Sequence, residues 1–201
     1  MNLPFLSVIV PTHKRSLLLS RALKSLKAQS AFVPIEIIVV SDTIDPDTDA
    51  VCANILTDVD IYVRRNGDPG PSKSRNLALS LANGDYVIFL DDDDALHPHC
   101  VEALYSYFSD KQSWPVYFNC SVVTERRLPC GPEVLSEAEV DLAGRLNDDV
   151  YVKNQIPLPC FVFPRQLLLG LTFDPHMRAY EDWDYVLAVF ERMVPKHLAI
   201  K

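Results

Sequence analysis

The stretch Tyr86-Val-Ile-Phe-Leu-Asp-Asp-Asp-Asp94 joins a short apolar run to four consecutive carboxylates. Its β-branched and aromatic residues predict a buried strand that ends at the acidic cluster. Alternate side chains of an extended strand end point to the same side, so Asp91 and Asp93 can converge on one cation. Carboxylate oxygens are ligands that Mg²⁺, Mn²⁺ and Ca²⁺ prefer. A solvated acidic turn is the alternative interpretation.

Similar apolar runs precede this strand and alternate with segments of helical period. The expected strands are Leu6–Val10, Ile35–Val40, Ile61–Val63 and Tyr86–Leu90, and the expected helices begin near Ser16, Asp47, Ser72 and Pro98. We expect Asn83-Gly84 to cap the third of these helices at its C-terminus. This alternation predicts an α/β fold with a mostly parallel central sheet and helices on both faces.

Polar residues follow three of these strands directly. Pro11-Thr12-His13 follows the first strand, Asp42 follows the second, and Asp91–Asp94 follows the fourth. Ligands of such sheets bind outside the carboxyl ends of the strands, so these residues are expected to form one site.

The second half of the chain carries weaker patterns. Trp114–Val123 predicts one more strand, and the polar segment Glu125–Tyr151 is interpreted as a loop or an irregular insertion. A last helix is expected over Glu181–Met193, and a carboxylate at its start, beside Trp183, could be desolvated and act as a base. The chain has no internal repeat, which favours one domain over residues 1–201.

Composition excludes several classes of protein. The 201 residues are 48% hydrophobic, which argues against disorder, and 19 Lys and Arg against 27 Asp and Glu give a net charge of −8. That charge argues against nucleic-acid binding. The five cysteines have no metal-binding spacing, no apolar run is long enough to span a bilayer, and the apolar start lacks the features of a signal peptide. We therefore expect a cytoplasmic protein, with peripheral association at the inner face of the membrane left open.

Five motifs occur in a fixed order along the chain. They are Ser7–Arg15, Ile38–Asp42, Ser74–Asn76 with Asn83–Tyr86, Phe89–Asp94 with Pro98, and Tyr180–Asp184. The ordered set resembles the family 2 glycosyltransferases of the GT-A fold. The resemblance spans residues 5–108 and 179–191.

This resemblance implies a single Rossmann-like GT-A domain. Residues 1–110 would form the half that binds a nucleotide-diphosphate sugar, and residues 111–201 the acceptor side with the catalytic base. Residues carried over to donor binding are Pro11, Thr12, His13, Asp42, Arg75, Asp91, Asp92 and Glu181. Among them, Asp42 would read the base edge, Arg75 would contact the nucleotide side of the donor, and Asp92 would touch the ribose.

The resemblance also implies metal-dependent, inverting chemistry. Asp91 and Asp93 fall on the family's D-x-D positions, which hold a divalent cation, Mn²⁺ or Mg²⁺, against the donor diphosphate. Asp182 matches the catalytic base. The acceptor would be a hydroxyl of a glycan or a lipid-linked molecule, in polysaccharide or cell-surface glycan synthesis. His13-Lys14 and Ser41–Ile44 depart from the family's usual residues and leave the choice of nucleotide base open.

Two alternatives remain at this point. A sugar-phosphate nucleotidyltransferase is also an α/β nucleotide binder, but it would carry a glycine-rich loop after the first strand, and none is present. A degenerate nucleotide-sugar-binding module would keep the fold and lose turnover, and the presence of Asp93 and Asp182 counts against it.

Overall fold

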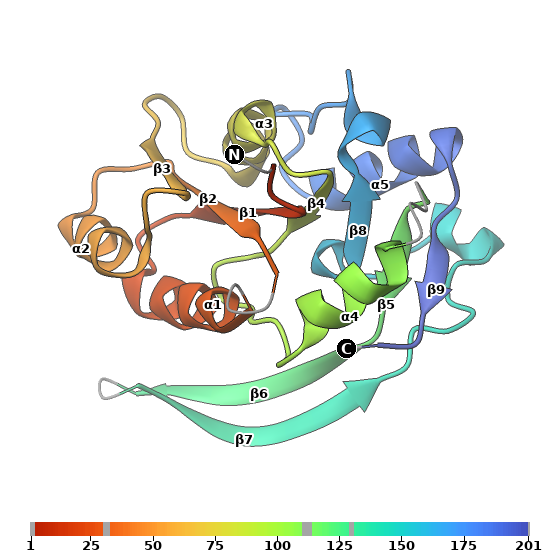
Figure 1. Ribbon diagram of the computed structural model, residues 1–201, viewed down its shortest axis with the longest axis horizontal. Helices are drawn as coiled ribbons and strands as arrows, with labels where there is room; N and C mark the ends of the chain where they lie inside the picture. The colour runs from red at the N-terminus through yellow and green to blue at the C-terminus, as the bar shows by residue number, and fades with distance from the viewer. Residues whose placement is uncertain (1–2, 30–32, 110–113, 129–130, 201) are drawn as a thin grey trace.

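A seven-stranded sheet in the order β3-β2-β1-β4-β8-β5-β9 forms the centre of the computed structural model (Figure 1). The structure describes residues 3–29, 33–109, 114–128 and 131–200. The strands of this sheet are β1 (Leu6–Thr12), β2 (Ile35–Ser41), β3 (Ile61–Arg64), β4 (Tyr86–Phe89), β5 (Val116–Phe118), β8 (Phe161–Pro164) and β9 (Lys196–Leu198).

Strand β1 lies between β2 and β4 and is parallel to both. All seven residues of β1 and of β2 are buried, as expected of parallel strands covered on both faces. Strand β8 runs antiparallel to β4 and β5, and β9 is parallel to β5. The predicted mostly parallel sheet is therefore confirmed, although strands β8 and β9 were not predicted.

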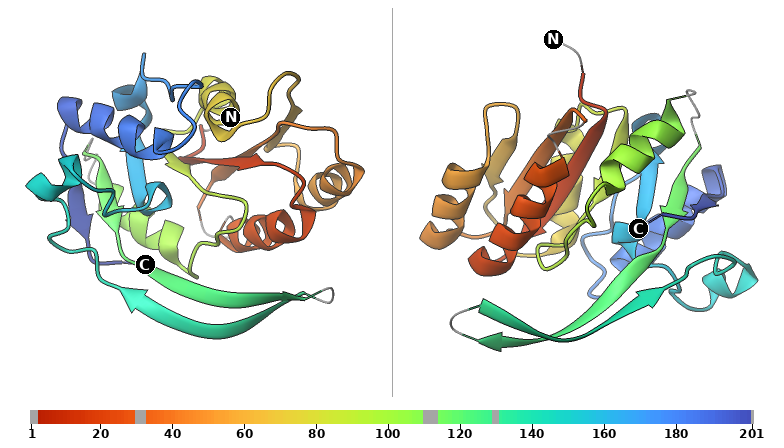
Figure 2. Two further views of the ribbon diagram at one scale, coloured as in Figure 1. Left: turned by 180° about the vertical axis from the view of Figure 1, so that it is seen from behind. Right: turned by 60° about the horizontal axis from the view of Figure 1, so that its bottom comes forward.

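Helices cover both faces of the sheet, as the sequence predicted. On one face, α1 (Ser16–Gln29), α2 (Pro46–Ile55) and α4 (Cys100–Phe108) contribute to one apolar core. On the other, α3 (Pro71–Leu81) and α5 (Glu181–Arg192) contribute to a second core (Figure 2). Short 3₁₀ turns occupy Asp148–Tyr151, Leu158–Cys160 and Arg165–Leu168. Within the described ranges, no helix has the length and apolar character needed to cross a bilayer.

The prediction of a loop or irregular insertion over Glu125–Tyr151 is wrong for most of that segment. Strands β6 (Cys120–Leu128) and β7 (Gly131–Val140) pair antiparallel in a long hairpin that lies beside α1 and α4 (Figures 1 and 2). Most of β6 is exposed, so neither face carries the apolar alternation by which a half-buried strand is read from sequence. The single strand expected over Trp114–Val123 is also wrong, because β5 ends at Phe118 and β6 begins at Cys120.

Gly84 is required by a close approach of two segments and not by a helix cap. Helix α3 ends at Leu81 with Ala82 as its C-cap, so the predicted role of Asn83-Gly84 as the cap is wrong. A Cβ on Gly84 would lie 2.6 Å from the Ser7 nitrogen and 2.7 Å from the Ser7 Oγ. The turn before β4 can therefore reach β1 only without a side chain at this position.

A buried carboxylate ties this turn to the first two strands. Glu36 is 4% exposed, and its Oε1 accepts hydrogen bonds from the Ser7 Oγ at 2.6 Å and from the backbone nitrogens of Asn83 at 2.5 Å and Gly84 at 3.0 Å. The Ser7 Oγ in turn accepts from the Gly84 nitrogen at 2.8 Å. The carboxylate thus satisfies donors from β1 and from the turn that begins β4.

We expect Glu36→Ala to lower the free energy of unfolding by about 3 kcal/mol, because it leaves several buried donors without an acceptor. Glu191→Ala, at an exposed position of α5, is the control and should change stability by less than about 0.5 kcal/mol. Denaturant unfolding of both variants measures the difference. Equal stabilities would contradict a structural role of the Glu36 carboxylate.

Candidate functional site

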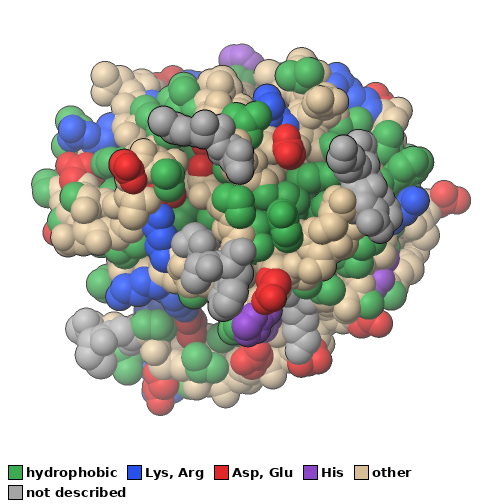
Figure 3. Space-filling view, in the orientation of Figure 1, with side chains coloured by type: hydrophobic (Ala, Val, Ile, Leu, Met, Phe, Trp, Pro, Cys, Tyr) green, Lys and Arg blue, Asp and Glu red, His purple; other side chains and the backbone are tan. Residues whose placement is uncertain are grey.

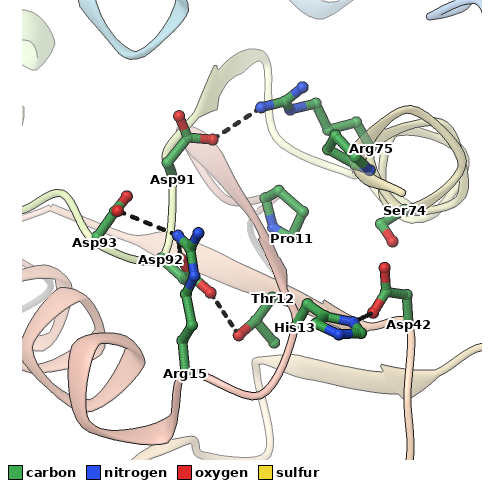
Figure 4. A pocket seen from close by; sticks show the side chains of 11 residues that line it. Pro11, Thr12, His13, Arg15, Asp42, Ser74, Arg75, Asp91, Asp92 and Asp93 are labelled. Atoms are coloured by element: carbon green, nitrogen blue, oxygen red, sulfur yellow. Dashed lines mark hydrogen bonds and ion pairs between the residues drawn. The ribbon is translucent and has the colours of Figure 1, made fainter. Parts of the chain in front are cut away.

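A cavity of about 420 Å³ lies at the carboxyl ends of β1, β2 and β4 (Figure 4). It brings together most of the residues that the sequence singled out. The lining residues are Pro11, Thr12, His13, Arg15, Asp42, Pro71, Ser74, Arg75, Asp91, Asp92 and Asp93. Glu181 and Asp182 are not among them.

Asp42 lies at one side of this cavity and is held by three neighbours. Its Oδ1 lies 2.5 Å from the His13 Nδ1, and its Oδ2 accepts a hydrogen bond of 2.7 Å from the Gly70 nitrogen. An Arg65 guanidinium nitrogen lies 3.5 Å from the same Oδ2. Asp42 is buried whereas half of the His13 side chain is exposed, so the imidazole is the more accessible part of this pair.

Asp92 and Asp93 at the other side of the cavity share one arginine. The Arg15 Nη1 lies 3.1 Å from both the Asp92 Oδ1 and the Asp93 Oδ2, and the Thr12 hydroxyl donates to the Asp92 Oδ2 at 2.8 Å (Figure 4). Burial raises the pKa of Asp92, and the Asp92 carboxylate raises the pKa of Arg15. Burial, with the charges of Asp91 and Asp93, raises the pKa of Asp94 to about 6.

Asp91 has a different partner, because Arg75 binds it from helix α3. The Arg75 Nη2 lies 2.8 Å from the Asp91 Oδ1, and its Nη1 lies 3.2 Å from the Glu181 Oε1 at the start of α5. The Arg75 side chain is 6% exposed, and its guanidinium carbon lies 5.4 Å from the centre of the Phe173 ring. Arg75 therefore joins the end of β4 to α5, and the sequence prediction did not include this bridge.

Asp182 occupies the first turn of α5, next to Glu181 and partly buried. Its Oδ1 accepts from the Trp183 nitrogen at 2.8 Å, and its Oδ2 lies 3.5 Å from the Asn154 Nδ2. Tyr180, at the N-cap, has a φ of +64°, so the chain turns sharply into the helix. Asp182 thus lies outside the cavity but one residue from the bridge to Asp91.

Arg15, Arg65 and Ser74 also line or support the cavity, and no role was predicted for them from the sequence. The Arg65 Nε donates to the Ser74 Oγ at 2.8 Å and its Nη2 donates to the Gly70 carbonyl at 2.8 Å, so Arg65 shapes the loop beside Asp42. Arg15 ends the motif Ser7–Arg15 and lies three residues after the end of β1. That position could have identified it as a residue of the cavity. Arg65 offered no such signal, because its contacts depend on the path of the loop before α3.

The residues at the acidic side fit a divalent cation held together with a diphosphate. Asp91 and Asp93 face the cavity with side chains 41% and 35% exposed, and each is bound to a separate arginine. Across the described parts of the chain, no group of three or more Asp, Glu, His or Cys side chains is arranged around one point. Mg²⁺ sites commonly use one or two carboxylates plus substrate phosphates, and this donor set matches that pattern.

The sequence matches the family model for glycosyl transferase family 2 over residues 7–149. The chain belongs to this family. The GalNAc(5)-diNAcBac-PP-undecaprenol β-1,3-glucosyltransferase of Campylobacter jejuni is 37% identical over 129 residues, which are 63% of this chain and 41% of that protein. The poly(ribitol-phosphate) β-N-acetylglucosaminyltransferase TarS of Staphylococcus aureus is 27% identical over 126 residues, 61% of this chain and 22% of that protein.

Solved structures share the fold over nearly the whole chain. TarS of S. aureus, residues 1–349, superposes with a TM-score of 0.75 at 23% identity and covers 98% of this chain and 58% of its own. The mannosyltransferase PcManGT of Pyrobaculum calidifontis, solved with GDP-Man and Mn²⁺, gives a TM-score of 0.66 at 19% identity, covering 98% of this chain and 55% of its own. These likenesses confirm the predicted GT-A fold. The chain spans less than two thirds of each of these relatives.

Removal of the Glu181 carboxylate should destabilise the protein through Arg75. We expect Glu181→Ala to lower the free energy of unfolding by about 1–3 kcal/mol, because the buried guanidinium loses one of its two partners. Asp184→Ala removes an exposed acid from the same first turn, and the helix dipole alone predicts a loss of about 0.3–1 kcal/mol. A loss for Glu181→Ala no larger than for Asp184→Ala would show that the bridge contributes no stability.

Proposed function

We propose that the protein is an inverting, metal-dependent glycosyltransferase that moves a sugar from a nucleotide-diphosphate donor to a hydroxyl acceptor. The observation that carries this proposal is the cavity, in which the ends of three parallel strands bring Asp42 and the Asp91–Asp93 cluster to opposite sides of one space. A nucleotide base at Asp42 and a diphosphate at the acidic side would fill it.

The side of the cavity beside Asp42 supports recognition of the nucleoside. The half-exposed His13 imidazole and the Asp42 carboxylate offer groups that can bond to a base edge, with Pro11 and Thr12 on the adjoining wall. Asp92 is proposed to contact the ribose. The guanidinium groups of Arg15 and Arg75 would attract the diphosphate, because they are permanently charged donors.

The acidic side supports binding of a divalent cation. Asp91 and Asp93 are proposed to hold Mn²⁺ or Mg²⁺ together with the donor phosphates, and the Mn²⁺ in the PcManGT structure supports this choice. The bound cation would screen the charge that develops on the departing diphosphate. Arg15 and Arg75 hold these same carboxylates in the structure, so donor binding would exchange carboxylate partners for phosphate ones.

Asp182 is proposed to act as the general base. In a direct displacement it accepts the proton of the acceptor hydroxyl while the hydroxyl oxygen bonds to the anomeric carbon and the bond to the diphosphate breaks. One base and one displacement invert the configuration at that carbon. Glu181, which the sequence assigned to donor binding, is now proposed to position α5 through Arg75, because it does not line the cavity.

The acceptor is proposed to be a hydroxyl of a glycan or of a lipid-linked molecule. The C. jejuni relative is named for an acceptor in which a glycan is carried on PP-undecaprenol, which supports a cell-surface glycan and a place of action at the inner face of the membrane. Residues 1–110 would then serve the donor and residues 111–201 the acceptor and the base.

A degenerate binding module is the second candidate function. It is favoured by one observation: Asp91, Asp92 and Asp93 already have arginine partners, so part of their negative charge is offset without a cation. The other alternative, a sugar-phosphate nucleotidyltransferase, loses its support because the chain belongs to glycosyl transferase family 2.

Calorimetric titration of nucleoside diphosphates tests the donor site. We expect at least one of them to bind with Mn²⁺ or Mg²⁺ present and to bind much more weakly in EDTA. In the presence of metal, Asp93→Asn should bind the nucleotide about 10–100-fold more weakly. A loss of that size follows removal of a group that only orients a metal ligand, and removal of a metal ligand itself should cost at least as much. Asp174→Asn, at an exposed loop residue outside the cavity, should bind as the parent does. Absence of binding for every nucleotide in the presence of metal would exclude the donor site.

Asp182→Asn separates an enzyme from a binding module. We expect this variant to bind the nucleotide normally and to lose transfer by about 10²–10⁴-fold, because the acceptor proton has no base to receive it. Asp184→Asn, two residues on and exposed, should retain transfer. Full activity of Asp182→Asn would show that another group acts as the base.

A further inference from the structure

A second, larger hollow adjoins the nucleotide cavity. A groove of about 870 Å³ separates the segment after β4, Asp91–Pro98, from the hairpin β6–β7. Asp91 and Asp93 line both this groove and the 420 Å³ cavity. A molecule lying in the groove would therefore meet a donor molecule at these two carboxylates.

Ion pairs with the body of the protein anchor the hairpin beside this groove. The Arg21 guanidinium of α1 donates to the Glu125 Oε2 at 2.6 Å and to the Asp93 carbonyl at 2.5 Å. Arg127 of the hairpin lies 3.7 Å from the Asp93 Oδ2. In the space-filling view, basic side chains gather between α1 and the hairpin, with acidic ones along the hairpin (Figure 3).

The groove wall on the hairpin carries apolar side chains that do not pack into either core. Val123 is 45% exposed and Val134 is 60% exposed, and both line the groove. These two valines give the hairpin wall of the groove an apolar part that is open to a ligand. Such side chains can contact the C–H faces of sugar rings.

The charges of the groove limit what can lie in it. Five carboxylates face two guanidiniums there, which gives 2 − 5 = −3. The carboxylates are those of Asp91, Asp93, Asp94, Glu125 and Glu137, and the guanidiniums are those of Arg21 and Arg127. With a divalent cation on Asp91 and Asp93 the sum becomes −3 + 2 = −1, so the groove offers a polyanion no net positive charge. Its carboxylate oxygens accept hydrogen bonds from sugar hydroxyls.

We propose that this groove binds the acceptor, that the acceptor is an uncharged saccharide chain, and that the inner face of hairpin β6–β7 is its wall. This proposal rests on the proposed function. The reacting hydroxyl would lie at the Asp91 end, next to the donor and to the Arg75–Glu181 bridge that leads to α5. A poly(ribitol-phosphate) acceptor, for which TarS is named, does not suit this charge.

A glycan array that carries neutral, amino-bearing, carboxylated and phosphorylated oligosaccharides tests the proposal. The full chain is applied with Mn²⁺ and a nucleoside diphosphate, and the protein is expected to bind neutral saccharides in preference to charged ones. Val134→Trp should weaken this retention about tenfold by filling the groove. Leu135→Trp, at the neighbouring exposed position that does not line the groove, should bind as the parent does. Thermal unfolding of both variants verifies that they fold.

Three results would overturn the proposal. They are stronger retention of acidic or of amino-bearing than of neutral saccharides, retention by a folded Val134→Trp variant equal to that of the parent, and retention of no saccharide by a chain that binds the nucleotide. Failure of the proposed function would appear separately, as absence of nucleotide binding in calorimetry. Saccharide retention that is sensitive to Val134→Trp would then still establish the groove as a saccharide site.

Discussion

Four consecutive carboxylates at the end of one rigid strand repel one another, and the structure around the site depends on how that repulsion is offset. The compensating charges come from separate parts of the chain: Arg15 after β1, Arg75 from α3, and Arg127 from the hairpin. Each arginine brings its own segment to the end of β4. The acidic cluster is therefore the point at which the loop after β1, helix α3 and the hairpin are held together.

The net charge of −8 is uninformative about ligands until its distribution is known. As a property of the whole chain, it argues only against polyanionic partners. Within the 420 Å³ cavity, two arginines stand among four carboxylates. In the adjoining groove, two arginines stand among five carboxylates. Both spaces are therefore acidic, and the arginines are the groups in each that can bind an anion.

The sequence predicted the parts of the fold in which burial is continuous. Strands β1, β2 and β4 are short apolar runs because helices cover both faces of the sheet, and their ends place Thr12, Asp42 and Asp91 at one site. The hairpin could not be predicted in this way, because its strands are exposed and show no alternation.

The sequence predicted those residues of the site that belong to a local motif, and it did not predict contacts between distant segments. The motif around Asp91 identified the acidic side of the cavity, but Arg75 and Glu181 are 106 residues apart, and their contact depends on how α5 packs on the sheet. The role of Glu36 in binding the turn at Gly84 could likewise not be predicted from the sequence. A carboxylate inside an apolar strand has meaning only when the turn at Gly84 is placed beside it.

Charged side chains, and not apolar packing, attach most of the hairpin to the rest of the protein. Beyond its base, ion pairs at Arg21 and Arg127 join it to the body, and its middle residues belong to neither apolar core. Substitutions along its inner face therefore leave the packing of the sheet unchanged. The hairpin can therefore change in sequence without disturbing either apolar core.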